Sequence, residues 1–562
     1  MKHILIILTL CAISLTAHAQ RDSLNVFASS SASIASNHNI RPLLSYSNQW
    51  GEYTQFDHAE ALIATGLAYR HTFRNPRLTF SAGFSAQLST DSLRTMLSQL
   101  YANFQLLMFD VRLGLENYTP IETNWSTAIG SFLMSNNARP YPRAWAGILR
   151  YWSIPLNRLP FSWASHLENI LQIRGGLSFA HVDDEGRSDY TDNVLLHEKF
   201  AYARIGRYFL KPYVGLYHSV CIGGTLSNGT KIPVDFINSF LGKRGDPEIF
   251  GNGKFRGETT NAAGGHQGLW DLGVDIALPF ADAKVYYQQP FVDSKTIKPI
   301  GHSRTDLQAG ILVHPHGLKA LQEFSIEFIT TKWCGGEGIP DPLVPNQKGG
   351  YTYLYPSEYD TNDIPHLKQD VLLSSDVAAW EATHGEIKTH NDIKEFFQAT
   401  YNHDCEYGGR LLYLENYCLE QGWTHAGLST GAPLLHTNEL VSRYAPQGTM
   451  PLKARFPNIR IRAFNFGLRG QVGPILYNFR LTASHNYGNF REKYIGEDPS
   501  SSWNPQPNYL FATTQHQTYS RLSLAANITP HWQLSTSYAL DLGDLYKSFS
   551  ARLSILYHIP LP

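Results

Sequence analysis

The sequence lacks an excess of charge of either sign. Its 46 lysine and arginine residues are balanced by 47 aspartate and glutamate residues, for a formal net charge of −1. Binding to nucleic acid or to a strongly acidic partner usually depends on a basic surplus. The composition therefore gives no support for a nucleic-acid partner.

Long apolar runs are also missing beyond the N-terminus. Lys2 and His3 precede an apolar run over 4–15, and Ala17 and Ala19 are the small residues of a cleavage site. This arrangement is typical of a secretory signal peptide, predicted at 1–19. The remaining chain has no uninterrupted apolar run of about 18 residues, so no transmembrane helix is expected. Any location in a membrane must come from strands.

Alternating patterns are present along most of the chain, most clearly over 269–289. Large apolar residues occupy every second position from Trp270 to Leu278, with Asp271, Gly273 and Asp275 between them. After a turn at 279–282 the alternation resumes. This pattern predicts a hairpin whose strands have one apolar and one polar face. A tilted strand needs roughly nine to eleven residues to cross a bilayer, and these strands are long enough.

The same pattern recurs to the C-terminus in about sixteen to nineteen candidate strands, joined near the end by short turns. The predicted fold is all-β: one large antiparallel transmembrane barrel of about eighteen strands. A soluble all-β exported protein is the alternative. Aromatic residues make up 13% of the chain, which suits the interfacial girdles of such a barrel. We expect an N-terminal arm, a periplasmic or plug element, or a first strand at 20–58. The barrel proper is expected at 59–562, with long irregular insertions near 222–265 and 335–420.

Four cysteines remain after the predicted signal peptide: Cys221, Cys334, Cys405 and Cys418. Export permits disulfides, and four cysteines allow three pairings. A loop closed by Cys405 and Cys418 is one possibility, and four free thiols are the other.

Motifs that could support catalysis or metal binding are weak. Gly427 to Gly431 matches G-x-S-x-G around Ser429, but the strand–turn–helix context of a nucleophile elbow does not follow it. The fragments 314–316 (His-Pro-His) and 403–405 (His-Asp-Cys) lack the paired spacing of a zinc site. We therefore predict no catalytic residue, no metal and no cofactor, and the ligand-binding residues stay unassigned.

Three groups of residues resemble one known family. They are the segment 47–51 (Ser-Asn-Gln-Trp-Gly), the hairpin with Asp271 and 286–293, and the run 416–434 with Gly422-Trp423 and Gly431-Ala432-Pro433. In this order they are similar to the capsule assembly protein Wzi family, in particular to its members from Bacteroidetes-type bacteria. The resemblance spans roughly 22–560. It implies an eighteen-stranded outer-membrane barrel whose lumen is obstructed by loops and N-terminal elements.

The resemblance also implies a function: attachment or assembly of capsular or surface polysaccharide by a lectin-like protein that is not an enzyme. The expected partners are that polysaccharide and outer-membrane lipid, and 335–420 is the candidate sugar-binding region. One alternative is a porin or solute transporter, in which Arg112, Glu116, Arg174 and Arg480 would face the lumen and set selectivity. A second alternative is an outer-membrane hydrolase that uses Ser429.

Overall fold

The structure of the protein is a computed structural model. It describes residues 22–75, 77–90, 95–182, 190–251, 255–259, 262–292, 306–334, 343–345, 351–353, 364–366, 368–369, 372–401, 413–416, 418–449, 454–489 and 508–561. The predicted signal peptide and Cys405 lie outside these residues. No helix within the described ranges is both long and apolar enough to cross a bilayer.

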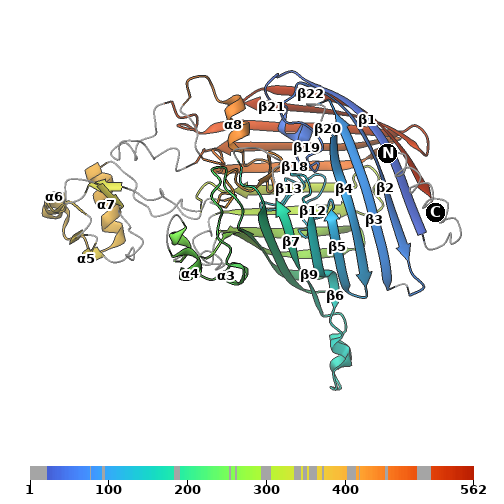
Figure 1. The fold of residues 1–562 in the computed structure, drawn as a ribbon, viewed down its shortest axis with the longest axis horizontal. Coiled ribbons are helices and arrows are strands. Elements are labelled where there is room, and N and C mark those ends of the chain that lie inside the picture. Colours follow the sequence, from blue (N-terminus) through green and yellow to red (C-terminus); the bar gives the residue numbers. More distant parts are fainter. Residues whose placement is uncertain are drawn as a thin grey trace.

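Eighteen strands form one antiparallel sheet that closes on itself (Figure 1). Each strand pairs with the next one along the chain, and the last strand pairs with the first. The strands are β1 (Asp22–Ala35), β2 (Ala59–Thr72), β3 (Leu78–Ser89), β4 (Thr95–Leu106), β5 (Phe109–Leu115), β6 (Arg143–Ser153), β7 (Leu171–Val182), β8 (Val194–Ile205), β9 (Leu210–Ile222), β10 (Gly265–Leu278), β11 (Ala281–Phe291), β12 (Leu307–Pro315), β13 (Glu323–Thr330), β18 (Ile461–Val472), β19 (Ile475–Asn486), β20 (Gln515–Asn527), β21 (Trp532–Gly543) and β22 (Ser548–Leu561).

The remaining elements are short and lie in the connections. Two small hairpins are β14 (Leu343–Pro345) with β15 (Tyr351–Tyr353), and β16 (Thr424–His425) with β17 (Leu428–Ser429). The helices are α2 (Leu43–Tyr46), α3 (Phe236–Leu241), α4 (Pro247–Phe250), α5 (Ile364–His366), α6 (Ser374–His384), α7 (His390–Tyr401) and α8 (Asn438–Tyr444), with single 3-10 turns at Leu156–Arg158, Ala164–Leu167 and Arg256–Thr259.

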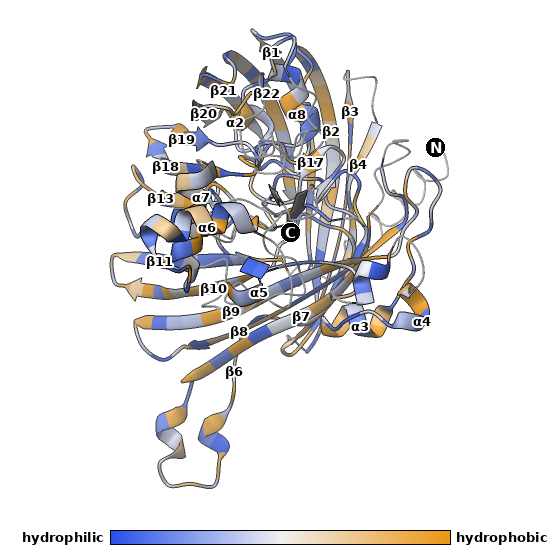
Figure 2. Ribbon diagram, turned by 90° about the vertical axis from the view of Figure 1, so that its left-hand side faces the viewer, coloured by the Kyte–Doolittle hydropathy of each residue, from blue (hydrophilic) through white to orange (hydrophobic). Residues whose placement is uncertain are grey.

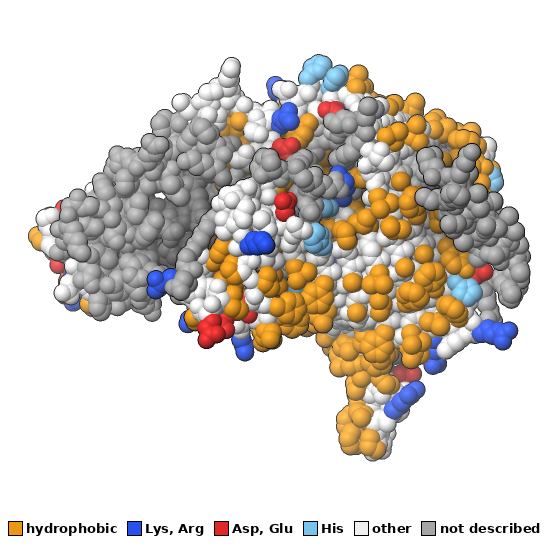
Figure 3. Space-filling view, viewed as in Figure 1, with side chains coloured by type: hydrophobic (Ala, Val, Ile, Leu, Met, Phe, Trp, Pro, Cys, Tyr) orange, Lys and Arg blue, Asp and Glu red, His pale blue; other side chains and the backbone are white. Residues whose placement is uncertain are grey.

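The barrel wall is apolar outside and polar inside. On β18, Phe464 is 50% exposed while its neighbour Asn465 is fully buried. On β19, Leu481 is 38% exposed and Thr482 is 1% exposed. This reversal of the usual soluble pattern is expected of a wall that faces lipid. Figure 3 shows apolar side chains spread over the outer wall, and Figure 2 shows the alternation of hydropathy along the strands.

The connections at the two rims differ in length. Most connections are short at the rim where β1 begins and β22 ends, such as the turns 107–108, 279–280 and 473–474; the longer connection 154–170 is an exception at this rim. The opposite rim carries the long connections 36–58, 116–142, 223–264 and 331–460. Outer-membrane barrels have short periplasmic turns and long extracellular loops, so the first rim is assigned to the periplasm. In Figure 1, α5, α6 and α7 project beyond the second, extracellular rim.

The boundary expected at residue 58 is corrected by the structure. Of the three interpretations of 20–58, the first strand applies to Asp22–Ala35, which pairs with β2 and with β22. The barrel therefore begins at β1. The Ser-rich strand was hard to foresee because small polar residues occupy many of the positions where a lipid-facing strand would show large apolar ones.

Candidate functional site

Three connections between strands fill the lumen of the barrel, and we call them the filling. The first is 36–58, between β1 and β2. Leu43 and Leu44 in α2 are each 1% exposed. The backbone N–H of Leu43 donates to Asp541 Oδ2 at 2.6 Å, and Arg552 Nη2 donates to the Ser45 carbonyl at 2.7 Å. Inward-pointing polar side chains of β21 and β22 thus satisfy backbone groups of an inserted segment, as buried peptide groups require.

A second segment, 116–142, fills the lumen from the connection between β5 and β6. The backbone N–H and the hydroxyl of Thr127 both donate to Glu323 Oε1, at 2.9 and 2.7 Å. The N–H of Ile129 donates to Glu327 Oε2 at 2.6 Å. Both carboxylates lie on β13, so charge-assisted hydrogen bonds hold this segment to the wall.

The third segment, 413–460, precedes β18 and packs on the second. Ser135 Oγ donates to the Gly431 carbonyl at 2.7 Å, and Asn137 Nδ2 donates to the Ser429 carbonyl at 2.9 Å. Figure 2 shows α2 and β17 within the ring of strands. Together the three segments obstruct the lumen.

The candidate nucleophile Ser429 belongs to this filling. It is 3% exposed at the end of the β16–β17 hairpin, and its Oγ accepts a hydrogen bond from the Gly431 N–H at 3.2 Å. A nucleophile elbow needs a strand before the serine and a helix after it, with the hydroxyl exposed. No helix follows Ser429 directly and its hydroxyl is buried, so the structure gives the hydrolase alternative no site at Ser429.

The charged residues predicted to face the lumen do so, but with different partners. Arg112 pairs with Glu116 at 2.8 Å, and Arg174 pairs with Glu122 of the inserted segment at 3.2 Å. Arg480 is 4% exposed, and among the described residues it forms no ion pair within 4.0 Å, unlike Arg112 and Arg174. Three of the four residues are therefore neutralised within the barrel, and Arg480 differs from them.

The histidine and cysteine fragments do not form the sites considered for them. The His314 ring stacks on Trp125 at 3.9 Å, and His316 Nε2 contacts Asp282 Oδ2 at 3.0 Å. The described residues hold no group of three or more potential metal ligands. Residues 403–405 lie outside them, and with Cys405 the proposed loop to Cys418. Cys418 is free in the structure and its thiol interacts with that of Cys221.

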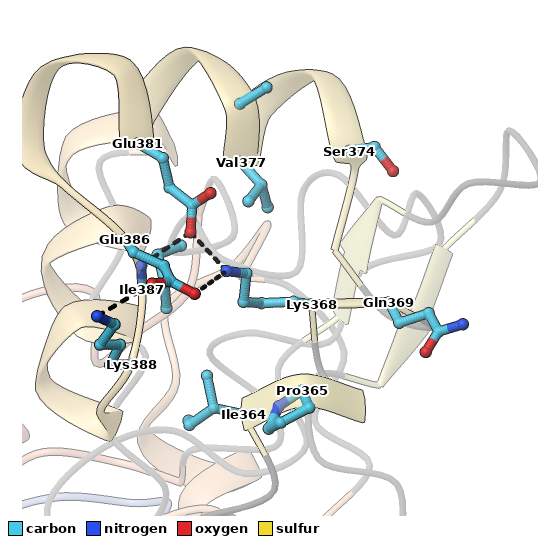
Figure 4. A pocket seen from close by; sticks show the side chains of 11 residues that line it. Ile364, Pro365, Lys368, Gln369, Ser374, Val377, Glu381, Glu386, Ile387 and Lys388 are labelled. Carbon is cyan, nitrogen blue, oxygen red and sulfur yellow. Dashed lines mark hydrogen bonds and ion pairs between the residues drawn. The ribbon is translucent and has the colours of Figure 1, made fainter.

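Outside the barrel, α5, α6 and the segment 385–388 surround an open pocket of about 510 Å³ (Figure 4). The Lys368 ammonium lies between two carboxylates, 2.6 Å from Glu381 Oε1 and 4.0 Å from Glu386 Oε1. Lys388 contacts Glu386 at 3.0 Å from the other side. The pocket thus presents a chain of alternating charges together with Gln369 and Ser374.

The hydrogen bond from Lys368 lowers the pKa of Glu381, and the Ile387 N–H, which donates to the same oxygen at 2.8 Å, acts in the same direction. Glu381 is therefore ionised at neutral pH and tied to both sides of the pocket. Carboxylates accept and ammonium groups donate, so the pocket can bond to a ligand rich in hydroxyl groups.

Trp380 on α6 has a structural role. Trp380 is 7% exposed, stacks on His384 at 4.6 Å and meets Phe396 of α7 edge to face. Among the described residues that line the pocket, none is aromatic. The pocket therefore offers a sugar ring polar contacts and no aromatic face among these residues. The sequence indicated the region 335–420 but not the charge cluster within it. Lys368 and Glu381 are distant in the sequence and come into contact only in the folded chain.

No family model matches the chain, and no curated protein matches it. Three solved structures illustrate the similarity that is found. One is Wzi of Escherichia coli, described as an outer-membrane protein involved in group 1 capsule assembly and a carbohydrate-binding β-barrel. It has 10% identity and a TM-score of 0.49, and the match covers 97% of this chain and 87% of that one.

The second is OccK5 (OpdH) of Pseudomonas aeruginosa, with 8% identity, a TM-score of 0.40, and coverage of 97% and 99%. The third is a loop-deletion mutant of OmpT, an outer-membrane protein of Vibrio cholerae, with 5% identity, a TM-score of 0.35, and coverage of 96% and 100%. The first of the three carries the name of the family that the sequence motifs resemble. Identities and scores this low do not decide function, and the barrel is established by its own strand register and apolar outer wall. The chain is an outer-membrane β-barrel of eighteen antiparallel strands, filled by its own loops.

Proposed function

We propose that this barrel attaches or organises capsular or other surface polysaccharide by binding it without catalysis. The observation that carries the proposal is the polar pocket of about 510 Å³ on the helical unit beyond the extracellular rim. Ligand pockets commonly fall between about 300 and 1,000 Å³ and use a few placed polar groups to orient the ligand. The volume of this pocket lies within that range.

The filled lumen supports the same proposal. Backbone groups of α2 and of 116–142 are hydrogen-bonded to Asp541, Glu323 and Glu327 on the wall. Loops held in this way form a fixed part of the lumen. A barrel that is filled inside and extended outside is suited to holding a ligand at the surface. The motifs that resemble the Wzi family favour polysaccharide as that ligand.

A loop deletion tests the proposal at the level of the helical unit. Residues 346–411 are replaced by a short Gly–Ser linker. The deletion stops before Tyr413, whose hydroxyl donates to Asp306 Oδ2 at 2.9 Å inside the filling. We expect polysaccharide to leave the cell surface and appear in the medium while the barrel stays folded. Unchanged surface staining, with the deletion confirmed, would rule out this unit as the binding element.

Point variants test the pocket itself. The pair Lys368→Gln and Glu381→Gln removes both charges at its centre and keeps hydrogen-bonding groups of similar size. Glu395→Gln is the matched control, because Glu395 is exposed on α7 and does not line the pocket. We expect the double variant to lower binding of purified surface polysaccharide at least about tenfold, as loss of hydrogen bonds to charged groups implies. Equal binding by the double variant and the control would remove the pocket from the proposal.

Solute transport is the second candidate function, and one observation favours it. Two cavities remain between the filling and the wall at β19 and β20. Under this alternative the filling would have to move aside, which conductance measurements detect.

A further inference from the structure

Two adjoining cavities, of about 190 and 380 Å³, lie inside the barrel between the filling and β18 to β22. Both are lined by Gln49, Asn478, Arg521 and Ser523. The smaller one reaches Leu476 at the start of β19, close to the short turn 473–474. The pair of cavities therefore lies toward the periplasmic rim and forms a vestibule there.

Two arginines stand side by side in the wall of this vestibule. In the register of β19 and β20, Arg480 lies directly opposite Arg521. Like charges in directly opposed positions of an antiparallel pair destabilise a sheet. A third guanidinium, that of Arg552, lines the smaller cavity. The arrangement is unfavourable unless a negative charge offsets it.

Within the described residues, the hydrogen bonds of Arg521 and Arg552 do not go to carboxylates. Arg521 Nε donates to the hydroxyls of Ser523 and Ser537, both at 3.0 Å, and its Nη1 donates to the Leu44 carbonyl at 3.3 Å. Arg552 donates to Gln49 Oε1 at 3.2 Å and to a carbonyl. All of these acceptors are neutral.

Among the described residues the Arg480 side chain makes no hydrogen bond, whereas Arg521 and Arg552 each donate several. Arg480 is 4% exposed, and its Nε atom is buried without a hydrogen-bond partner. Glu323 and Glu327 on β13 are close enough to Arg480 to interact with it electrostatically, but each also accepts hydrogen bonds from other groups. Glu323 accepts from Ser126 and Thr127, and Glu327 accepts from Tyr286 and Ile129. Arg469 also reaches Glu323, at 3.7 Å. A buried charge without a partner is costly, so a group that pairs with Arg480 would bind favourably.

We propose that the vestibule binds an oxyanion carried by a small polar solute, with Arg480 and Arg521 as its ligands. Guanidinium groups bind carboxylate and phosphate through paired hydrogen bonds. The rest of the larger cavity consists mainly of amides and hydroxyls, with the Trp125 ring at one side. These groups match the hydroxyls and the apolar face of a sugar. A sugar acid and a sugar phosphate share this chemistry, and the two are separated by the test below. The inference does not depend on polysaccharide binding at the extracellular pocket.

The test is the thermal unfolding of the full-length barrel in detergent at constant ionic strength. The probes are sodium glucuronate, glucose 6-phosphate and neutral glucose. We expect a saturable rise in unfolding temperature with one or both anions and none with glucose. A carboxylate source is indicated by a response to glucuronate, and a phosphate source by a response to glucose 6-phosphate.

The variants Arg480→Gln and Arg521→Gln should each weaken the response at least about tenfold, as loss of a charged hydrogen-bond donor implies. Arg204→Gln is the matched control, since Arg204 is also in the wall but pairs with Asp275 at 2.8 Å. Its anion response should be unchanged. The wild-type measurement alone keeps the test valid if a variant fails to fold. Equal shifts with glucose and with the anions, or no saturable shift with either anion, would overturn the proposal.

Discussion

At the scale of single residues, burial places some titratable groups in states that differ from those in water. His436, in the segment 413–460, is fully buried. Its Nδ1 lies 3.0 Å from the Tyr444 hydroxyl, and its Nε2 lies 3.4 Å from that of Tyr519. Burial lowers the pKa of His436 to about 3. The neutral imidazole is therefore part of the contact between the filling and β20.

This pKa predicts that acid weakens the folded barrel. Between the ordinary histidine pKa of about 6.5 and a pKa of about 3, the unfolded chain binds a proton that the folded chain does not. The contribution of His436 to the free energy of unfolding is then fully present above about pH 6.5. It falls by about 1.4 kcal/mol for each pH unit between about 6.5 and about 3. His436→Gln should flatten the dependence of unfolding temperature on pH between 7 and 5. An identical slope in wild type and variant would contradict the role assigned to His436.

At the scale of elements, the sequence predicted hairpins well where both faces of a strand are distinct. The hairpin expected over 269–289 is β10 and β11, with the turn at 279–280. Leu272 and Val285 face outward, while Asp271 and Lys284 are buried inside. The first strand was only one of three interpretations, because 22–35 has a weak contrast between its faces. The filling segments could not be predicted in place, since their bonds join residues far apart in the chain, such as Leu43 and Asp541.

The contact between α2 and the wall gives a prediction at this scale. Asp541→Ala removes the acceptor for the Leu43 N–H inside the lumen, and an unsatisfied buried donor costs about 1–3 kcal/mol. We expect a lower unfolding temperature and faster proteolysis at 36–58. Tyr546→Phe is the control, because it removes the 2.9 Å hydrogen bond from Tyr546 to the same carboxylate and leaves the Leu43 bond in place. Equal proteolysis at 36–58 in both variants would show that Asp541 does not hold α2.

At the scale of the whole molecule, the filled lumen governs permeability. The segments 36–58, 116–142 and 413–460 are hydrogen-bonded to the barrel wall or to one another inside the lumen. The aromatic content and the alternation predicted the barrel. A plug element was one of three interpretations of 20–58, and the resemblance to a known family implied that the lumen is obstructed. Lumen-facing residues such as Arg174 and Arg480 look alike in the sequence. Their different partners appear only when the inserted segments are in place.

We therefore expect no steady open channel from the wild-type protein in a planar bilayer. The physical reason is that an open path needs loops held by charge-assisted hydrogen bonds to be displaced. Single-channel recording measures this directly, with Asp541→Ala as a variant expected to show brief openings. A constant conductance in the wild type would favour the transporter alternative over surface attachment.

The pairing of β1 with β22 has a consequence for how the barrel comes into being. Ser30 lies opposite Ile555 where β1 and β22 pair. The outer edge of β1 therefore stays unpaired until β22, the last strand of the barrel, is in place. Until then two unpaired edges exist, and such edges pair readily with other chains. Closing so distant a contact is also slow. Closure of the barrel therefore competes with association of the free edges with other chains. A truncated chain that lacks β22 cannot close.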